Sequence, residues 1–328
     1  MSTQLGVNQI QPLDDPVRRE ADQTARRIQK DIEAALLALS VAATAVISEV
    51  SLLIVRVQFS NIMQLLVEPL QEELKIVYND LTDLYNKVGQ MTMNEVVRGQ
   101  AFDTLDPQTL QALQEARALL LANISDTVRL TVANTIAAGL QAGQAAEKIA
   151  ENIAQTIGLT VQQAQAVLNY QRMLEAGDVT GALARELRDR RYDAATAQAG
   201  TQPMAPAKAA AAVRRYAERM RAYRSETISI TQSAAAGAEG RRQAWRQLIA
   251  RGVVDTDTIR RFWLTAADEL VCPNCSAIPS WNPDGIPMTA QYKTPIGLVD
   301  GPTLHPRCRC SERIEGTVNP GYEEAENG

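Results

Sequence analysis

The amino-acid sequence predicts a mainly α-helical fold, with an elongated multi-helix body and a small, loop-rich α+β module near the C-terminus. Three observations lead to this prediction. Only 4% of the 328 residues are aromatic. Ala, Gln and Arg recur along the whole chain, which favours helices over the strands of a sandwich, a barrel or a doubly wound sheet. Apolar residues also repeat at helical spacing through most of the chain, until prolines and cysteines replace this pattern near its end.

One long helix is predicted over residues 17–67, because apolar residues recur there in steps of three and four. They are Ile32, Leu36, Leu39, Ala43, Val46, Val50, Leu53 and Val57. Further apolar residues broaden this stripe, so we expect the helix to be covered on more than one side, in a bundle or a homo-oligomer. A membrane-active amphipathic helix is the alternative. The uncharged stretch Ala34–Ser48 is too short for a membrane span.

Further helices are predicted by their boundaries. A second helix follows Pro69 and ends near Gly89, and Asp106 with Pro107 forms a typical helix start. A pair of helices is expected within 125–175, where Thr160 and Gln163 have the spacing of a capping box. Residues 194–206 are predicted to be a linker. The predicted domains are the N-terminal helices 1–100, a helical body 101–205, a C-terminal domain 206–315 and an acidic tail 316–328.

A basic segment spans residues 207–261, which hold twelve Lys or Arg and five Asp or Glu, a net charge of +7 in a chain of net charge −5. Most arginine runs of this kind are solvated helix faces. The alternative is a surface that contacts nucleic-acid phosphates or an acidic partner. Its candidate residues, expected on two successive helices, are Arg214, Arg215, Arg219, Arg221, Arg224, Arg241, Arg242 and Arg246.

All four cysteines and the only histidine lie within residues 272–310. The order is Cys272-Pro-Asn-Cys275, a long interval, and then His305-Pro-Arg-Cys308-Arg-Cys310. Two-residue gaps allow both side chains of a pair to reach one ion, and these five donors exceed the four that tetrahedral Zn²⁺ requires. The start of the chain lacks the features of a secretory signal, so we expect a reducing cytosol and metal binding rather than disulfides.

We therefore predict a structural Zn²⁺ bound by Cys272, Cys275, His305 and either Cys308 or Cys310. Half of the chain's fourteen prolines lie between Cys272 and Cys310, and large aliphatic residues are few there, so an ion would hold a segment with little core. If Arg309 were in an extended segment, Cys308 and Cys310 would point to opposite faces, and one of them would be a spare core residue.

An enzyme is not expected. A zinc nucleobase deaminase needs His-x-Glu before its Cys-x-x-Cys, and here the histidine comes afterwards. A thiolate that is bound to a metal is a poor nucleophile, which disfavours a thiol protease. Asp268 and Glu269 precede the first cysteine pair and are expected to support or cap the site. The alternatives are a zinc-containing nucleic-acid-binding protein and, less favoured, a zinc-dependent hydrolase.

The sequence from about residue 207 onward resembles the head-morphogenesis family of tailed phages, the minor head proteins of the phage Mu F type. Four segments carry the resemblance: Arg224-Ser-Glu226-Thr227, the Ala/Gly-rich helix that follows to Trp245, the stretch from Trp263 to Asp268-Glu269, and His305-Pro-Arg-Cys308-Arg-Cys310. The last of these is the most specific. The resemblance covers roughly the last third of the chain, with a looser match over 125–175.

This resemblance implies a non-enzymatic virion component, made in the host cytoplasm and located inside the capsid near the portal vertex. Its implied partners are the portal protein, the major capsid or scaffolding protein and, without sequence specificity, double-stranded DNA. Such a protein assists head assembly and the packaging or ejection of DNA, and has no small-molecule substrate. Residues 17–67 are expected to dock to the portal or to form a homo-oligomer.

Overall fold

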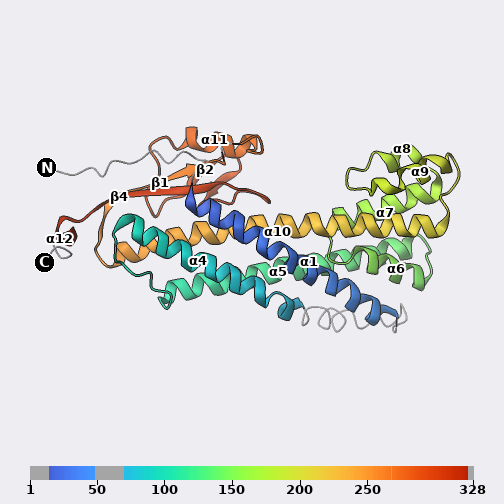
Figure 1. Ribbon diagram of the computed structural model, residues 1–328, viewed down its shortest axis with the longest axis horizontal. Helices are drawn as coiled ribbons and strands as arrows, with labels where there is room; N and C mark the ends of the chain where they lie inside the picture. Colours follow the sequence, from blue (N-terminus) through green and yellow to red (C-terminus); the bar gives the residue numbers. More distant parts are fainter. Residues whose placement is uncertain (1–14, 49–69, 267, 324–328) are drawn as a thin grey trace. The chain divides into compact units, whose positions relative to one another are not determined.

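The protein is described here from a computed structural model, in which residues 15–48, 70–266 and 268–323 are described (Figure 1). The helices are α1 (Pro16–Ser48), α4 (Lys75–Val96), α5 (Pro107–Gln141), α6 (Ala146–Thr156), α7 (Val161–Ala176), α8 (Val179–Leu183), the 3₁₀-helix η2 (Arg190–Tyr192), α9 (Asp193–Ala199), α10 (Pro206–Ala250), α11 (Pro273–Trp281) and α12 (Pro320–Glu323). The strands are β1 (Val254–Leu264), β2 (Tyr292–Thr294), β3 (Gly297–Val299) and β4 (Ser311–Val318). This arrangement confirms the prediction of a mainly helical protein with a small α+β module. Within the described ranges, no helix combines the length and apolarity that crossing a membrane requires.

The chain forms two compact units, and neither is a continuous stretch of sequence. Unit 1 comprises residues 1–29, 76–117 and 227–328, and unit 2 comprises residues 30–75 and 118–226. They do not follow the predicted consecutive domains 1–100, 101–205 and 206–315, because α1, α5 and α10 each contribute residues to both units.

The N-terminal helix α1 buries one apolar stripe, as its periodicity predicts. Ile28, Ile32, Leu36 and Leu39 are at most 2% exposed and follow one another at steps of four, four and three residues. The predicted continuation of this helix from residue 49 to residue 67 lies outside the described residues.

Two predicted helix boundaries are wrong, and one of them is at Gly89, which serves close packing rather than helix termination. Helix α4 continues through Gly89 to Val96, and a Cβ on Gly89 would lie 2.8 Å from the Phe102 ring. Helix α10 is one 45-residue helix instead of two. It passes through Gly240, where a Cβ would lie 2.4 Å from the Tyr85 carbonyl oxygen.

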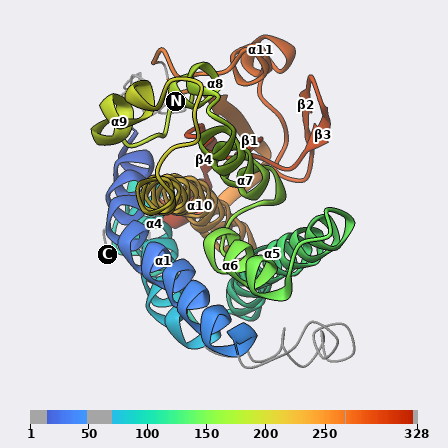
Figure 2. The same cartoon turned by 90° about the vertical axis from the view of Figure 1, so that its right-hand side faces the viewer.

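Unit 2 contains the predicted capping box, but its helices differ from the predicted pair. Helix α5 begins at Pro107, where the Thr109 amide donates to the Asp106 carboxylate at 2.9 Å, and it continues through residue 125 to Gln141. Thr160 and Gln163 cap the start of α7 reciprocally. Figure 2 shows α6 next to the C-terminal half of α5. The predicted linker 194–206 begins inside α9 and is irregular only from Gly200 to Ala205.

In unit 1, strands β1 and β4 pair in an antiparallel ladder from Val254 with Val318 to Leu264 with Ser311. Trp245 of α10, Ile259 of β1 and Ile314 of β4 share one buried cluster. The short hairpin β2–β3 and helix α11 follow β1, and α11 contacts β1 and β2 (Figures 1 and 2). Because Leu264 lies opposite Ser311, the ladder brings together the segments that hold the two cysteine clusters.

Candidate metal centre

The first cysteine pair lies at the N-terminus of α11. Cys272 is the N-cap residue, Pro273 occupies the first turn, and the Cys275 amide donates to the Cys272 sulfur at 3.4 Å. This geometry directs both sulfurs to the same end of the helix. Free backbone amides at a helix start also favour a negatively charged thiolate there.

The second cluster is a tight turn that precedes β4. The Cys308 amide donates to the His305 carbonyl at 3.1 Å, and Arg307 between them adopts a left-handed φ of 64°. The Arg307 amide also donates to the Thr231 hydroxyl of α10 at 2.9 Å, which attaches the turn to the long helix. Nothing in the sequence indicates this role for Thr231.

The two clusters meet, as the sequence predicts. The His305 Nε2 atom is 3.1 Å from the Cys272 sulfur and 3.3 Å from the Cys275 sulfur. The Cys275 sulfur is in turn 3.8 Å from that of Cys308. Two groups of potential ligands result, Cys272–Cys275–His305 and Cys275–Cys308–Cys310, each with all ligand atoms within 4.8 Å of one another. All four cysteines are free thiols.

Cys308 and Cys310 do not point to opposite faces, because the chain turns between His305 and Cys308 and enters the regular ladder only at Ser311. Both are at least 96% buried, and both lie near Cys275. The five donors thus form one site with a shared cysteine at its centre.

The imidazole of His305 is oriented by its neighbours for metal binding. Its Nδ1 atom is 2.8 Å from the Pro306 carbonyl oxygen, to which it donates as Nδ1–H. This bond leaves Nε2 with a lone pair that faces the sulfurs, the arrangement found at metal-binding histidines. Burial lowers the pKa of His305, but the Pro306 carbonyl and the nearby Cys308 and Cys272 thiolates raise it, and the pKa is raised on balance.

Hydrogen bonds among the thiols determine which of them ionises most easily. A hydrogen bond from Cys310 lowers the pKa of Cys308 to about 5, and this bond and burial raise the pKa of Cys310. Burial and the Cys308 charge raise the pKa of Cys275. Burial alone would raise the pKa of Cys272, but hydrogen bonds from Cys275 and the His305 charge lower it below its usual value. A bound cation would displace the remaining thiol protons, so metal binding here releases protons.

The surroundings of the site support it on two sides. Arg309 forms an ion pair with Asp268, which connects the second cluster to the segment before the first; Glu269 is exposed. Trp263, Ile278, Ile286 and Tyr292 pack with Cys275, Cys308 and Cys310 in one buried cluster, in which the Trp263 and Tyr292 rings meet edge to face at 5.3 Å. The module therefore has a small core, and the cysteines are part of it.

The donor set can hold one metal ion. Thiolate and imidazole are soft or borderline ligands, which suit Zn²⁺ in tetrahedral geometry. With Zn–S bonds of about 2.3 Å, two sulfurs on one tetrahedral ion lie about 3.8 Å apart, the separation of Cys275 and Cys308.

The predicted arginine surface is wrong for four of its eight members. Arg221, Arg224, Arg241 and Arg242 are at least 91% buried. The first two donate to backbone carbonyls of Gln155 and Gly158, at 3.3 and 2.7 Å. Arg241 bonds Asp15 at 3.2 Å, and Arg242 bonds Glu312 at 3.1 Å. These guanidinium groups therefore form hydrogen bonds and ion pairs inside the protein rather than a surface.

The other four arginines are accessible, and the prediction for them stays untested. Arg214, Arg215 and Arg219 are exposed on α10, and the Arg246 side chain is 41% exposed and pairs with Glu239.

The sequence did not reveal one buried carboxylate, which pairs with two of the buried arginines in unit 1. Glu312 is fully buried in β4 and accepts from Arg242 and Arg261. The only indication in the sequence is that Glu312 lies two residues before Ile314, on the same face of a strand.

Comparison of the chain with protein-family models, curated proteins and solved structures finds no match.

Proposed function

We propose that Cys272, Cys275, His305 and Cys308 bind a single structural Zn²⁺. The observation that carries this proposal is the meeting of the two clusters, in which His305 Nε2 lies within 3.3 Å of two sulfurs and Cys275 lies 3.8 Å from Cys308. Cys308 is favoured over Cys310 as the fourth ligand because it shares a turn with His305 and lies at the ligand-to-ligand distance from Cys275. Cys310 then stays a thiol beside the site.

Such a site is structural rather than catalytic. Four protein ligands leave no position for the water molecule that a zinc-dependent hydrolase activates. Neither group of potential ligands includes a carboxylate, and Cys275, Cys308 and Cys310 are buried. A bound water on the metal would contradict this assignment and favour a hydrolase.

At the level of the whole protein, we infer a structural role as a minor head protein of a tailed phage, associated with the portal and packaged DNA. Two points support this inference. The sequence resemblance is most specific in His305–Cys310, and these residues form half of the metal centre. The rest of the described chain is mainly helical, and long helices offer extended surfaces for partner proteins.

Co-assembly with phage head proteins tests this role. The chain would be produced together with a portal protein and a major capsid protein of the same phage, and the assemblies separated on a density gradient. We expect the chain to sediment with portal-containing particles in few copies. A chain that stays at the top of the gradient while complete heads form would contradict the role.

Non-specific DNA binding is a second candidate, favoured by exposed arginines in unit 2. Arg214 and Arg190 are exposed, whereas neighbouring Arg215 and Arg219 are partly neutralised by Glu218 and Asp189. With about two phosphates contacted, the logarithm of the affinity for duplex DNA should fall by about 2 per tenfold rise in salt. A double substitution of Arg190 and Arg214 by Gln should remove most of this slope, and DNA retention that does not depend on salt would exclude the candidate.

A further inference from the structure

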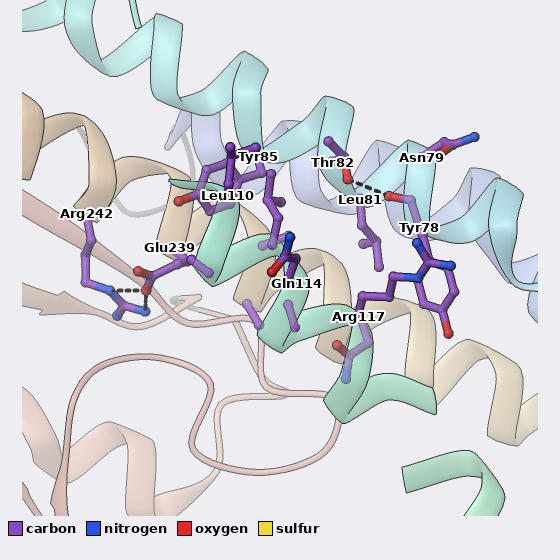
Figure 3. A pocket seen from close by; sticks show the side chains of 16 residues that line it. Tyr78, Asn79, Leu81, Thr82, Tyr85, Leu110, Gln114, Arg117, Glu239 and Arg242 are labelled. Carbon is purple, nitrogen blue, oxygen red and sulfur yellow. Dashed lines mark hydrogen bonds and ion pairs between the residues drawn. The ribbon is translucent and has the colours of Figure 1, made fainter. Parts of the chain in front are cut away.

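A cavity of about 400 Å³ lies between α4, α5 and α10 in unit 1 (Figure 3). Leu81, Leu110, Leu113 and Ala235 contribute to its apolar walls. Its volume falls in the range of pockets that bind small molecules. The cavity is separate from the metal centre, since none of the cysteines nor His305 lines it.

Two tyrosine side chains form part of the cavity wall. The Tyr78 and Tyr85 side chains line the cavity, and these residues are only 7% and 2% exposed. Their phenol oxygens have almost no accessible surface, so the rings rather than the hydroxyl groups face the cavity.

The charges around the cavity leave one cation without a counter-ion. Glu239 is neutralised by Arg242 and Arg246, and Arg242 also pairs with buried Glu312. The Arg117 guanidinium instead lies over the Tyr78 ring, 4.9 Å from its centroid, and no carboxylate in the described part of the chain pairs with it. Arg117 is exposed at the edge of the cavity and can approach a ligand freely.

We propose that this cavity binds a small amphipathic anion, with an aromatic or branched apolar body and one carboxylate or sulfonate group. The body lies between the leucines of α4 and α5, where it excludes water from apolar surface. The anionic group pairs with Arg117, the lining cation with no other counter-ion. The Tyr78 and Tyr85 rings extend the wall around this body. This binding site does not depend on the metal centre or on the role in a phage head.

Fluorescence titration with anilinonaphthalene sulfonate, which has an aromatic body and one sulfonate, tests the proposal on the full zinc-loaded chain. We expect saturable binding of about one probe per chain. Arg117→Gln should weaken it about tenfold, because it removes one charge-assisted contact. Ala116→Trp should weaken it at least as much, because Ala116 lines the cavity and is exposed, so the larger ring fills the cavity without entering the core.

Two matched variants on the same helix serve as controls. Arg129→Gln and Ala118→Trp replace exposed residues of α5 that do not line the cavity, and both should bind the probe as the unchanged chain does. The proposal is overturned if the folded chain binds no probe or binds it at many sites. It is also overturned if Arg117→Gln and Ala116→Trp bind as tightly as their controls.

Discussion

Cys308 and Cys310 are separated by one residue and are both buried near Cys275, yet the account gives them different roles. We propose Cys308 as a metal ligand and Cys310 as a thiol that donates a hydrogen bond to it. We predict that Cys308→Ser lowers the zinc content well below one per chain, whereas Cys310→Ser keeps about one. Elemental analysis of the two purified variants measures this difference. Equal loss in both, or loss only in Cys310→Ser, would reverse the assignment.

Glu312 is a charged residue in the interior of unit 1, and its charge is expected to affect stability. Its carboxylate is fully buried and accepts from Arg242 at 3.1 Å and from Arg261 at 3.0 Å. Glu312→Gln leaves the Arg261 guanidinium buried without its counter-ion, which should cost about 3 kcal/mol in the free energy of unfolding. Urea unfolding measures the change.

Glu315→Gln on the same strand is the control, because the Glu315 side chain is 32% exposed and pairs with Arg313, 30% exposed. Its cost should stay below about 1 kcal/mol. If the two variants unfold at the same urea concentration, Glu312 does not have the structural role inferred here.

The sequence is sufficient to predict that the two cysteine clusters meet, but not where the arginines lie. Cysteine and histidine spacing limits where an ion can bind, so the convergence of Cys272 and His305 is predictable. Arg241 and Arg242 pair with Asp15 and Glu312, which are remote in sequence, in addition to the local partner Glu239 of Arg242. A local excess of positive charge therefore does not distinguish a solvated face from a buried network.

At the scale of elements, the capping box at the start of α7 involves only residues close in sequence, so its loss should affect stability only through this helix end. The Thr160 hydroxyl accepts from the Gln163 amide at 3.2 Å. Thr160→Ala should lower the free energy of unfolding by about 1 kcal/mol, because an amide at the helix start loses its partner. Thermal unfolding checks it.

The matched control is Thr127→Ala, inside α5, where the hydroxyl donates to the Asn123 carbonyl of its own helix. Alanine is the better helix former, so this variant should be neutral or slightly stabilising. A Thr160→Ala variant as stable as the control would show that the cap contributes nothing.

Helix starts were predictable and some helix ends were not, for a physical reason. Asp106 and Thr160 cap helices through their own side chains, so the signal is in the sequence. Gly89 instead lies inside α4, where the Phe102 ring occupies the place that a Cβ would need. A glycine that permits close packing and a glycine that ends a helix look identical in a sequence.

At the scale of the whole molecule, we propose that the fold of the metal-binding module depends on zinc, whereas unit 2 has a core of its own. Removing zinc with a chelator should greatly accelerate amide hydrogen exchange over residues 268–310, since the free energy of zinc binding stabilises that fold. Exchange in unit 2 should stay unchanged, because its buried cluster around Tyr170 and Tyr216 contains no metal ligand. Hydrogen exchange with mass spectrometry measures both regions at once, and equal protection of 268–310 with and without zinc would contradict the dependence.

The central claim is that two clusters far apart in the sequence bind one zinc ion. X-ray absorption at the zinc edge, measured on the purified full chain, tests this claim most directly. The account predicts about one zinc per chain with three sulfur ligands at about 2.3 Å and one imidazole nitrogen at about 2.0 Å. A chain without zinc, or a zinc ion with oxygen ligands in place of these sulfurs, would contradict it.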